Sequence, residues 1–383
     1  MKELLEMRME GERKSIQHLN AGMGRIAAHE NSARLVQELL AAEMGKLGFD
    51  DVDEDSLGTV YGIIRGVERG EPLWVIAHSD DHRACALSAV CAAGAIKGSL
   101  LPLRGDLIVS CVSRSLFGNY AVEHFYEEVL KHRYPAIKGV LLSEPTGGSV
   151  NLGHKGRVEY EIVVRGHVAG RVLQSGGVNM LGTIFPLVSE LEKVSEGLPR
   201  DTALGRSSLR IKDIHYNTPP EGGSPQEFRV AVDRVFVPEE SPGAILERAR
   251  GIATAIYRSC ADLDVSTALV RNRYETPQGA EEIVSEWKPW IMAGHDPFAL
   301  SSLEALREGG FKPEFGYWKQ TFTEGSFTRG KLGLPTLGFG PGGEEAGSGE
   351  PSAREIERAA LGQALIMHRA IGIPSFGWDA DEI

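Results

Sequence analysis

The sequence predicts an α/β protein whose sheet is mostly parallel and covered by helices on both faces, with a smaller α+β domain inserted into it. Two patterns carry this prediction. Towards both ends of the 383-residue chain, short apolar runs alternate with helical stretches, and continuous apolar strands separated by helices are typical of a buried parallel sheet. In the middle of the chain the strands partly alternate between apolar and polar residues, which indicates a separate domain.

The larger domain is expected to begin and end with helix. Apolar residues recur at three- and four-residue spacing within the first 50 residues, and Gly48 ends that pattern. Later apolar runs are short and continuous, as expected for buried strands. The strands are expected at residues 73–77, 107–112, 140–143 and 334–340, with helices at 84–97 and 353–371.

The inserted domain shows the order β-α-β-β-α-β, which is the split unit of a ferredoxin-like domain. Its strands are expected at residues 158–165, 208–216, 227–237 and 266–274, and its helices at 178–194 and 244–260. The sequence therefore predicts a larger domain of residues 1–157 and 271–383 around an inserted domain of residues 158–270. Because one face and an open edge of an isolated four-stranded sheet would be exposed, we expect a homodimer that pairs through the inserted domain.

Composition excludes several classes of protein. Hydrophobic residues make up 42% and charged residues 25% of the chain, as in globular proteins. A net charge of −12 without a basic stripe argues against nucleic-acid binding. The charged N-terminus has no apolar stretch, so we expect no export signal, and no apolar run approaches the roughly 18 residues of a membrane span. The four cysteines have no CxxC spacing, which favours free thiols in a reducing, cytoplasmic compartment.

Polar residues follow the apolar runs at the points where ligands bind in an open α/β sheet, at the carboxyl ends of its strands. In an extended chain His78, Asp80 and His82 share one side, whereas Asp81 faces the other. Imidazole and carboxylate groups together suit a divalent metal such as zinc, although a solvated polar loop is the alternative interpretation. The residues expected at this edge are His78, Asp80, Asp81, His82 and, after the run at 140–143, Glu144.

Several short motifs together resemble the zinc-dependent family that includes aminoacylases, acetylornithine deacetylase, succinyl-diaminopimelate desuccinylase and glutamate carboxypeptidase. They are AHSD at residues 77–80, SEPT at 143–146, GHKGR at 153–157, GGVN at 176–179, TEG at 323–325 and LPTLGFGPG at 334–342. The resemblance covers nearly the whole chain and implies a zinc-exopeptidase-like fold, in which the inserted domain is both lid and dimer interface. It implies metal-binding roles for His78, Asp81 and Glu144, and ligand-binding roles for His154 and Asn179.

The sequence departs from this family where the family holds its second metal ion and activates water. The family's Glu-Glu pair falls on Arg114 and Ser115, its C-terminal histidine on Gly347, and its lid histidine on Gly170. We therefore expect either no metal or one divalent ion, such as zinc, at a residual site. The candidate catalytic residues are Asp80, His82 and Arg114.

Arg114 places a permanent cation where the family has a carboxylate. Its guanidinium is expected either to pair with Glu144 or Asp80 in the place of a metal, or to bind an anionic ligand bidentately.

These departures leave three functional hypotheses. The leading one is a divergent family member that binds a small amino-acid-like or anionic ligand without family-type hydrolysis. The alternative is an amidohydrolase with a rebuilt mononuclear-metal or metal-free site that hydrolyses an N-acyl amino acid or a peptide amide. The third is a structural subunit that pairs with an active paralogue.

Overall fold

The computed structural model describes residues 1–26, 32–112, 118–166, 180–217, 226–258, 263–276, 279–284, 286–344 and 349–374. The contacts between residues divide the chain into two compact units. The first consists of Met1–His154, Glu275–Gly279 and Trp290–Ile383, and the second of Lys155–Tyr274 and Ala280–Pro289.

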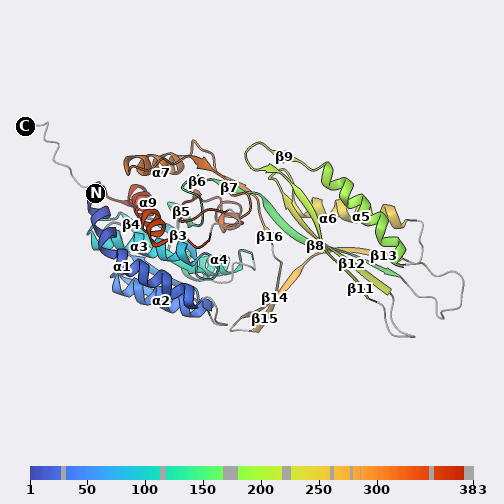
Figure 1. Ribbon diagram of the computed structural model, residues 1–383, viewed down its shortest axis with the longest axis horizontal. Coiled ribbons are helices and arrows are strands. Elements are labelled where there is room, and N and C mark those ends of the chain that lie inside the picture. The colour runs from blue at the N-terminus through green and yellow to red at the C-terminus, as the bar shows by residue number, and fades with distance from the viewer. Residues whose placement is uncertain are drawn as a thin grey trace, which may run out of the picture. The chain divides into compact units, whose positions relative to one another are not determined.

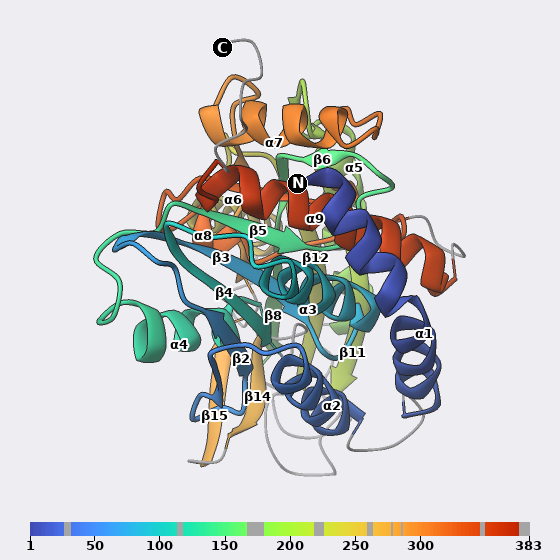
Figure 2. The ribbon, with the colours of Figure 1, turned by 90° about the vertical axis from the view of Figure 1, so that its left-hand side faces the viewer.

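The described residues of the first unit form an eight-stranded sheet in the order β1-β2-β4-β3-β5-β19-β6-β18 (Figures 1 and 2). Its centre is parallel, because β3 pairs in parallel with β4 and β5, and β5 pairs in parallel with β19. The mostly parallel α/β sheet expected from the sequence is thus confirmed. The strands are β1 (Asp51–Glu54), β2 (Val60–Ile64), β3 (Gly70–His78), β4 (Gly105–Val112), β5 (Gly139–Ser143), β6 (Val150–Asn151), β18 (Phe315–Gly316) and β19 (Thr336–Gly338).

Helices pack on this sheet through small or aromatic residues. Helix α3 is rich in alanine, so it lies close against β3, and α9 packs beside it. Trp74 of β3 instead contacts Phe125 of α4, with ring centroids 5.8 Å apart. The helices are α1 (Lys2–Ile26), α2 (Ser32–Lys46), α3 (Arg83–Gly98), α4 (Tyr120–Phe125), α7 (Pro297–Glu308), α8 (Gly325–Thr328) and α9 (Ala353–Ile371), and a π-helical turn, Tyr126–Leu130, follows α4.

The second unit contains a four-stranded antiparallel sheet in the order β11-β12-β8-β13, and β16 also pairs with β8. The element order β8-α5-β11-β12-α6-β13 is the expected β-α-β-β-α-β order. The expected last strand at residues 266–274 is instead divided, because β13 ends at Leu269 and β14 begins at Arg271. The elements are β8 (Gly156–Gly166), α5 (Met180–Glu196), β9 (Arg200–Asp201), β10 (Gly205–Arg206), β11 (Ser208–Asn217), β12 (Gln226–Phe236), α6 (Pro242–Tyr257), β13 (Leu263–Leu269), β14 (Arg271–Thr276), β15 (Gly279–Val284) and β16 (Glu286–Trp287).

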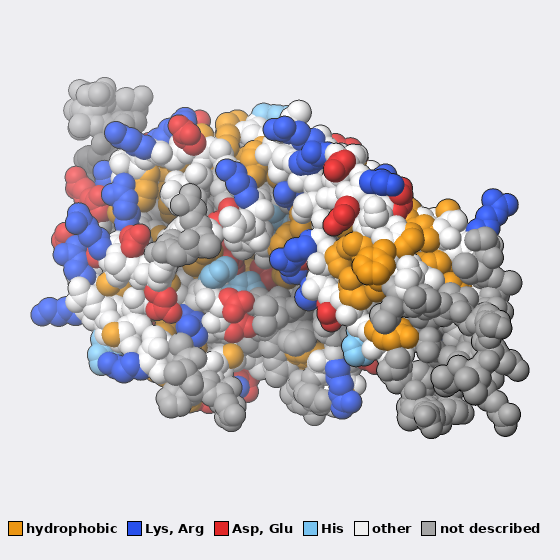
Figure 3. All heavy atoms as spheres, turned by 45° about the vertical axis from the view of Figure 1, so that its right-hand side comes forward, with side chains coloured by type: hydrophobic (Ala, Val, Ile, Leu, Met, Phe, Trp, Pro, Cys, Tyr) orange, Lys and Arg blue, Asp and Glu red, His pale blue; other side chains and the backbone are white. Residues whose placement is uncertain are grey.

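The two faces of this second sheet differ in polarity. Alternate residues of β8, such as Tyr160 and Ile162, are buried in a core that α5 and α6 complete. Most of the residues between them are charged, with Val163 as the exception, and Glu161 is paired with Arg229 of β12 at 3.3 Å. On the molecular face in Figure 3, basic and acidic side chains are interspersed, without a continuous basic stripe.

Two further observations bear on the expectations from composition. Among the described helices, none has the length and apolar character needed to cross a membrane. Cys85, Cys91 and Cys111 are buried free thiols, whereas Cys260 lies outside the described residues.

Candidate metal centre

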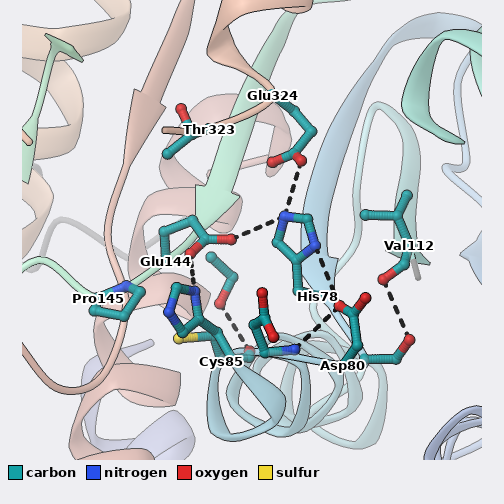
Figure 4. A network of polar contacts seen from close by, with 12 residues as sticks. His78, Asp80, Cys85, Val112, Glu144, Pro145, Thr323 and Glu324 are labelled. Carbon is teal, nitrogen blue, oxygen red and sulfur yellow. Dashed lines mark hydrogen bonds and ion pairs between the residues drawn. The ribbon is translucent and has the colours of Figure 1, made fainter. Parts of the chain in front are cut away.

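Three buried side chains meet at the carboxyl edge of the first sheet (Figure 4). His78 is the last residue of β3, and Glu144 directly follows β5. Glu324 directly precedes the short helix α8. None of the three residues is more than 3% exposed, so the cluster is almost entirely removed from water.

The three side chains are arranged as metal ligands would be. Nε2 of His78 lies 2.9 Å from Oε1 of Glu324 and 3.3 Å from Oε1 of Glu144. One potential ligand atom from each residue lies within 4.8 Å of the other two. An imidazole and two carboxylates form a donor set that suits zinc and other divalent transition metals.

Unsatisfied atoms in the cluster indicate that it can hold a cation. Nδ1 of His78, Oε1 of Glu144 and Oε2 of Glu324 are buried and make no hydrogen bond. Buried polar atoms are almost always paired, so each such exception calls for an explanation. A divalent ion bound between the carboxylates would neutralise their charge and satisfy the free oxygens.

The charges of the cluster shift the pKa values of its members. Burial opposes the charged imidazole, but the carboxylates of Glu324 and Glu144 raise the pKa of His78 well above its ordinary value. Burial likewise opposes ionisation of Glu144, yet His82 and His78 hold the pKa of that carboxyl below its usual range. The two carboxylates therefore favour a positive charge beside them, which either a proton on His78 or a bound cation could supply.

Two of the predicted catalytic residues, Asp80 and His82, lie beside the cluster. Oδ1 of Asp80 lies 3.7 Å from Nδ1 of His78, on the side of the ring opposite to the two glutamates. Nδ1 of His82 lies 2.5 Å from Oε2 of Glu144. In metal sites a carboxylate beside the second nitrogen of a ligating histidine orients the ring; Asp80 occupies that position, although its carboxylate lies beyond hydrogen-bonding distance of Nδ1.

The backbone around Glu144 is held by close packing. The indole Nε1 of Trp318 donates to the carbonyl of Pro145 at 2.8 Å. Gly340, just beyond β19, lies so close that a Cβ added there would be 2.5 Å from the carbonyl oxygen of Glu144. The segment that follows β19 therefore packs directly against the backbone of Glu144.

Asp81, which the family resemblance implies as a metal ligand, lies outside this cluster. The chain bends after β3, and the Asp81 residue is exposed while its backbone N–H donates to Asp80. Together with His82 and Arg83, it lines a cavity of about 270 Å³ within the first unit.

His154, an expected ligand-binding residue, is buried and bound to the backbone of Thr323. Arg114 and Asn179 lie outside the described residues, as do Ser115, Gly170 and Gly347.

Glu324 was not among the candidate residues from the sequence. Its TEG motif was recognised, but no predicted strand ends beside it, and it lies far from His78 along the chain. A signal was nevertheless present, because Glu324 is an acidic residue between Phe322 and Phe327, in a segment otherwise free of charge.

Comparisons with known proteins give the fold a wider context. No protein-family model matches this chain. The uncharacterized protein YgeY of Escherichia coli strain K12 is 25% identical over 356 residues, which cover 83% of this chain and 84% of the relative.

Solved structures are similar over nearly their whole length. The dipeptidase Dug1p from Saccharomyces cerevisiae matches with a TM-score of 0.70 at 10% identity, covering 97% of this chain and 98% of that one. YXEP from Bacillus subtilis, a dinuclear metal-binding peptidase of the M20 family, matches with a TM-score of 0.64 at 11% identity, covering 95% and 97%. The resemblance to metal-dependent peptidases is thereby confirmed at the level of the fold.

Proposed function

Since the chain has the fold of the M20-family peptidases, we propose that it is a hydrolase of amide or peptide bonds that uses a single divalent metal ion. The observation that carries this proposal is the buried cluster of His78, Glu144 and Glu324, with its unsatisfied nitrogen and oxygen atoms.

The three side chains would hold the ion and leave a coordination position open, as in catalytic zinc sites. When bound, the metal would polarise the substrate carbonyl and lower the pKa of a water molecule. Asp80 is a positioning residue in this proposal, because its carboxylate faces Nδ1 of His78. His82 is the proposed proton-transferring group, since its side chain is 35% exposed and also contacts Glu144.

The proposed substrate is a small peptide or an N-acyl amino acid. The peptide substrate is suggested by the dipeptidase among the similar structures and by the probable carboxypeptidase of Uncinocarpus reesii, which is 26% identical over 148 residues that cover 37% of this chain and 32% of the relative. We also propose a homodimer and a cytoplasmic location, as expected from the sequence.

The second candidate is binding of an amino-acid-like or anionic ligand without hydrolysis. The replacement of the family's base and lid histidine by Arg114, Ser115 and Gly170 favours it. In that case the cluster would be a structural or ligand-binding metal site.

Amine release from a panel of dipeptides and N-acetyl amino acids distinguishes the two candidates. The wild-type protein is assayed after loading with zinc, manganese or cobalt, beside Glu324→Gln and the control Glu304→Gln, which alters an exposed residue of α7. We expect hydrolysis by the wild type and the control, and none by Glu324→Gln. Metal binding without any hydrolysis would favour the second candidate, whereas failure to bind metal would reject the proposed metal-dependent activity.

A further inference from the structure

The chain on the N-terminal side of Glu324 is fixed by a buried histidine. The backbone N–H of Thr323 donates to Nε2 of His154 at 2.9 Å. A backbone amide can only donate, so Nε2 is the acceptor and carries no proton. The carbonyl oxygen of Thr323, 3.2 Å from the same nitrogen, therefore receives no hydrogen from it.

The chain on the C-terminal side of Glu324 is fixed by a buried tryptophan. A Cβ added to Gly325 would be 2.1 Å from Cε2 of Trp290 and 2.4 Å from its Nε1. The backbone of Gly325 thus lies flat against the indole ring, and only glycine permits this approach.

The two residues that fix this segment belong to one small ladder. His154 of β7 (Gly153–His154) is the register partner of Trp290 of β17 (Trp290–Ile291). Their rings meet edge to face, with centroids 5.7 Å apart and an interplanar angle of 80°. His154 is 1% and Trp290 3% exposed, so both rings are packed on all sides by other residues.

We infer that His154 and Trp290 are positioning residues that hold the carboxylate of Glu324 at the metal site. They act on Thr323 and Gly325, the two neighbours of the ligand, and so set the direction in which its side chain leaves the backbone. This inference rests on the proposed metal function and assigns His154 a role other than direct ligand binding.

The ladder also marks where the chain crosses between the two units. The second unit begins at Lys155, directly after His154, and ends at Pro289, directly before Trp290. Every residue of the ladder belongs to the first unit, and the chain also passes between the two units at Tyr274–Glu275 and at Gly279–Ala280.

Zinc affinity of the full-length protein tests this role, measured by competition with a chromophoric chelator. We expect His154→Ala to raise the Kd for zinc about 10- to 100-fold, as loss of an outer-shell partner of a ligand typically does. His154→Gln keeps an acceptor and should restore part of the affinity. His368→Ala is the matched control, because His368 is also a buried histidine of the first unit, and it should leave the Kd unchanged.

A double-mutant comparison separates positioning from general loss of structure. With Glu324→Gln already present, His154→Ala should weaken zinc binding no further, because the ligand that it positions is gone. An equal fold-change in both backgrounds, or an unchanged Kd in the single variant, would overturn the inference.

Should His154→Ala not fold, Trp290→Phe provides the second variant. This substitution removes part of the aromatic ring against which Gly325 packs, so it should also raise the Kd for zinc. An unchanged Kd would overturn the inference. Wild-type protein that binds no zinc would overturn the proposed function itself, whereas wild-type binding with unaltered variants would overturn only the positioning role.

Discussion

Nε2 of His78 lies 2.9 Å from Oε1 of Glu324, although the two residues come from distant parts of the chain. The same nitrogen faces Glu144 at 3.3 Å. His78 alone cannot neutralise two buried carboxylates, and His82, the second imidazole beside Glu144, is 35% exposed and lies on the other oxygen of that carboxylate. A divalent cation would balance this charge, and the following predictions depend on that relationship.

Glu324→Gln should remove a metal ligand while preserving side-chain volume. Its Kd for zinc should rise by more than about 100-fold, because loss of even an outer-shell partner costs about 10- to 100-fold. Calorimetric titration of metal-free protein with zinc measures the change, and Glu304→Gln, on the exposed face of α7, is the control. Equal affinities in both variants would remove Glu324 from the metal site.

Asp80 and Asp81 are neighbours in the sequence but should contribute differently to the affinity for zinc. Asp80→Ala should weaken zinc binding about 10-fold or more, because His78 loses the carboxylate that orients its ring. Asp81→Ala should leave the affinity nearly unchanged, since this residue is exposed and lies outside the cluster. A larger loss in Asp81→Ala would show that Asp81 is the ligand, as the family resemblance implies.

Gly340→Ala should disturb Glu144 through the backbone. The added methyl group would meet the carbonyl oxygen of Glu144 at 2.5 Å, and overpacking of this kind costs about 1–3 kcal/mol. We expect a lower free energy of unfolding by denaturant titration, together with weaker zinc binding. Gly343→Ala is the control, because its nearest neighbouring atom would be 4.0 Å away; similar losses in both variants would contradict this account.

Dimerisation through the second unit remains a prediction. Phe185 of α5 is 71% exposed, so it is the apolar residue of this unit that we propose to test as a dimer contact. Light scattering should show a dimer at micromolar concentration, and Phe185→Glu should shift it towards monomer. Leu300→Glu, at an exposed apolar residue of the first unit, should not. A monomeric wild type would exclude the homodimer.

The sequence predicted the elements whose signal is local. The apolar runs at residues 73–77 and 140–143 became β3 and β5, because continuous apolar segments must be buried on both faces of a sheet. The C-terminal helix was placed at residues 353–371, where Ser352 and Glu355 form a capping box. At the start of the chain, one predicted helical region proved to be two helices, α1 (Lys2–Ile26) and α2 (Ser32–Lys46).

The metal cluster was predictable only in part. His78 and Glu144 follow strong strand signals, so their meeting at one edge could be expected. Glu324 follows no strand, and its place beside His78 results from the tertiary contacts of His154 and Trp290, which leave no periodic pattern. The alternation of an extended chain placed Asp80 and Asp81 on opposite sides, and the structure has Asp81 exposed and Asp80 facing His78.

Metal stoichiometry tests the central claim most directly. Purified protein is saturated with zinc, dialysed against metal-free buffer and analysed by plasma emission. One zinc ion per chain in the wild type, and a clear loss in Glu324→Gln, is the result that a mononuclear His78–Glu144–Glu324 site predicts. Wild-type protein with no zinc, with two ions per chain, or with one ion that Glu324→Gln retains at the same affinity would contradict it.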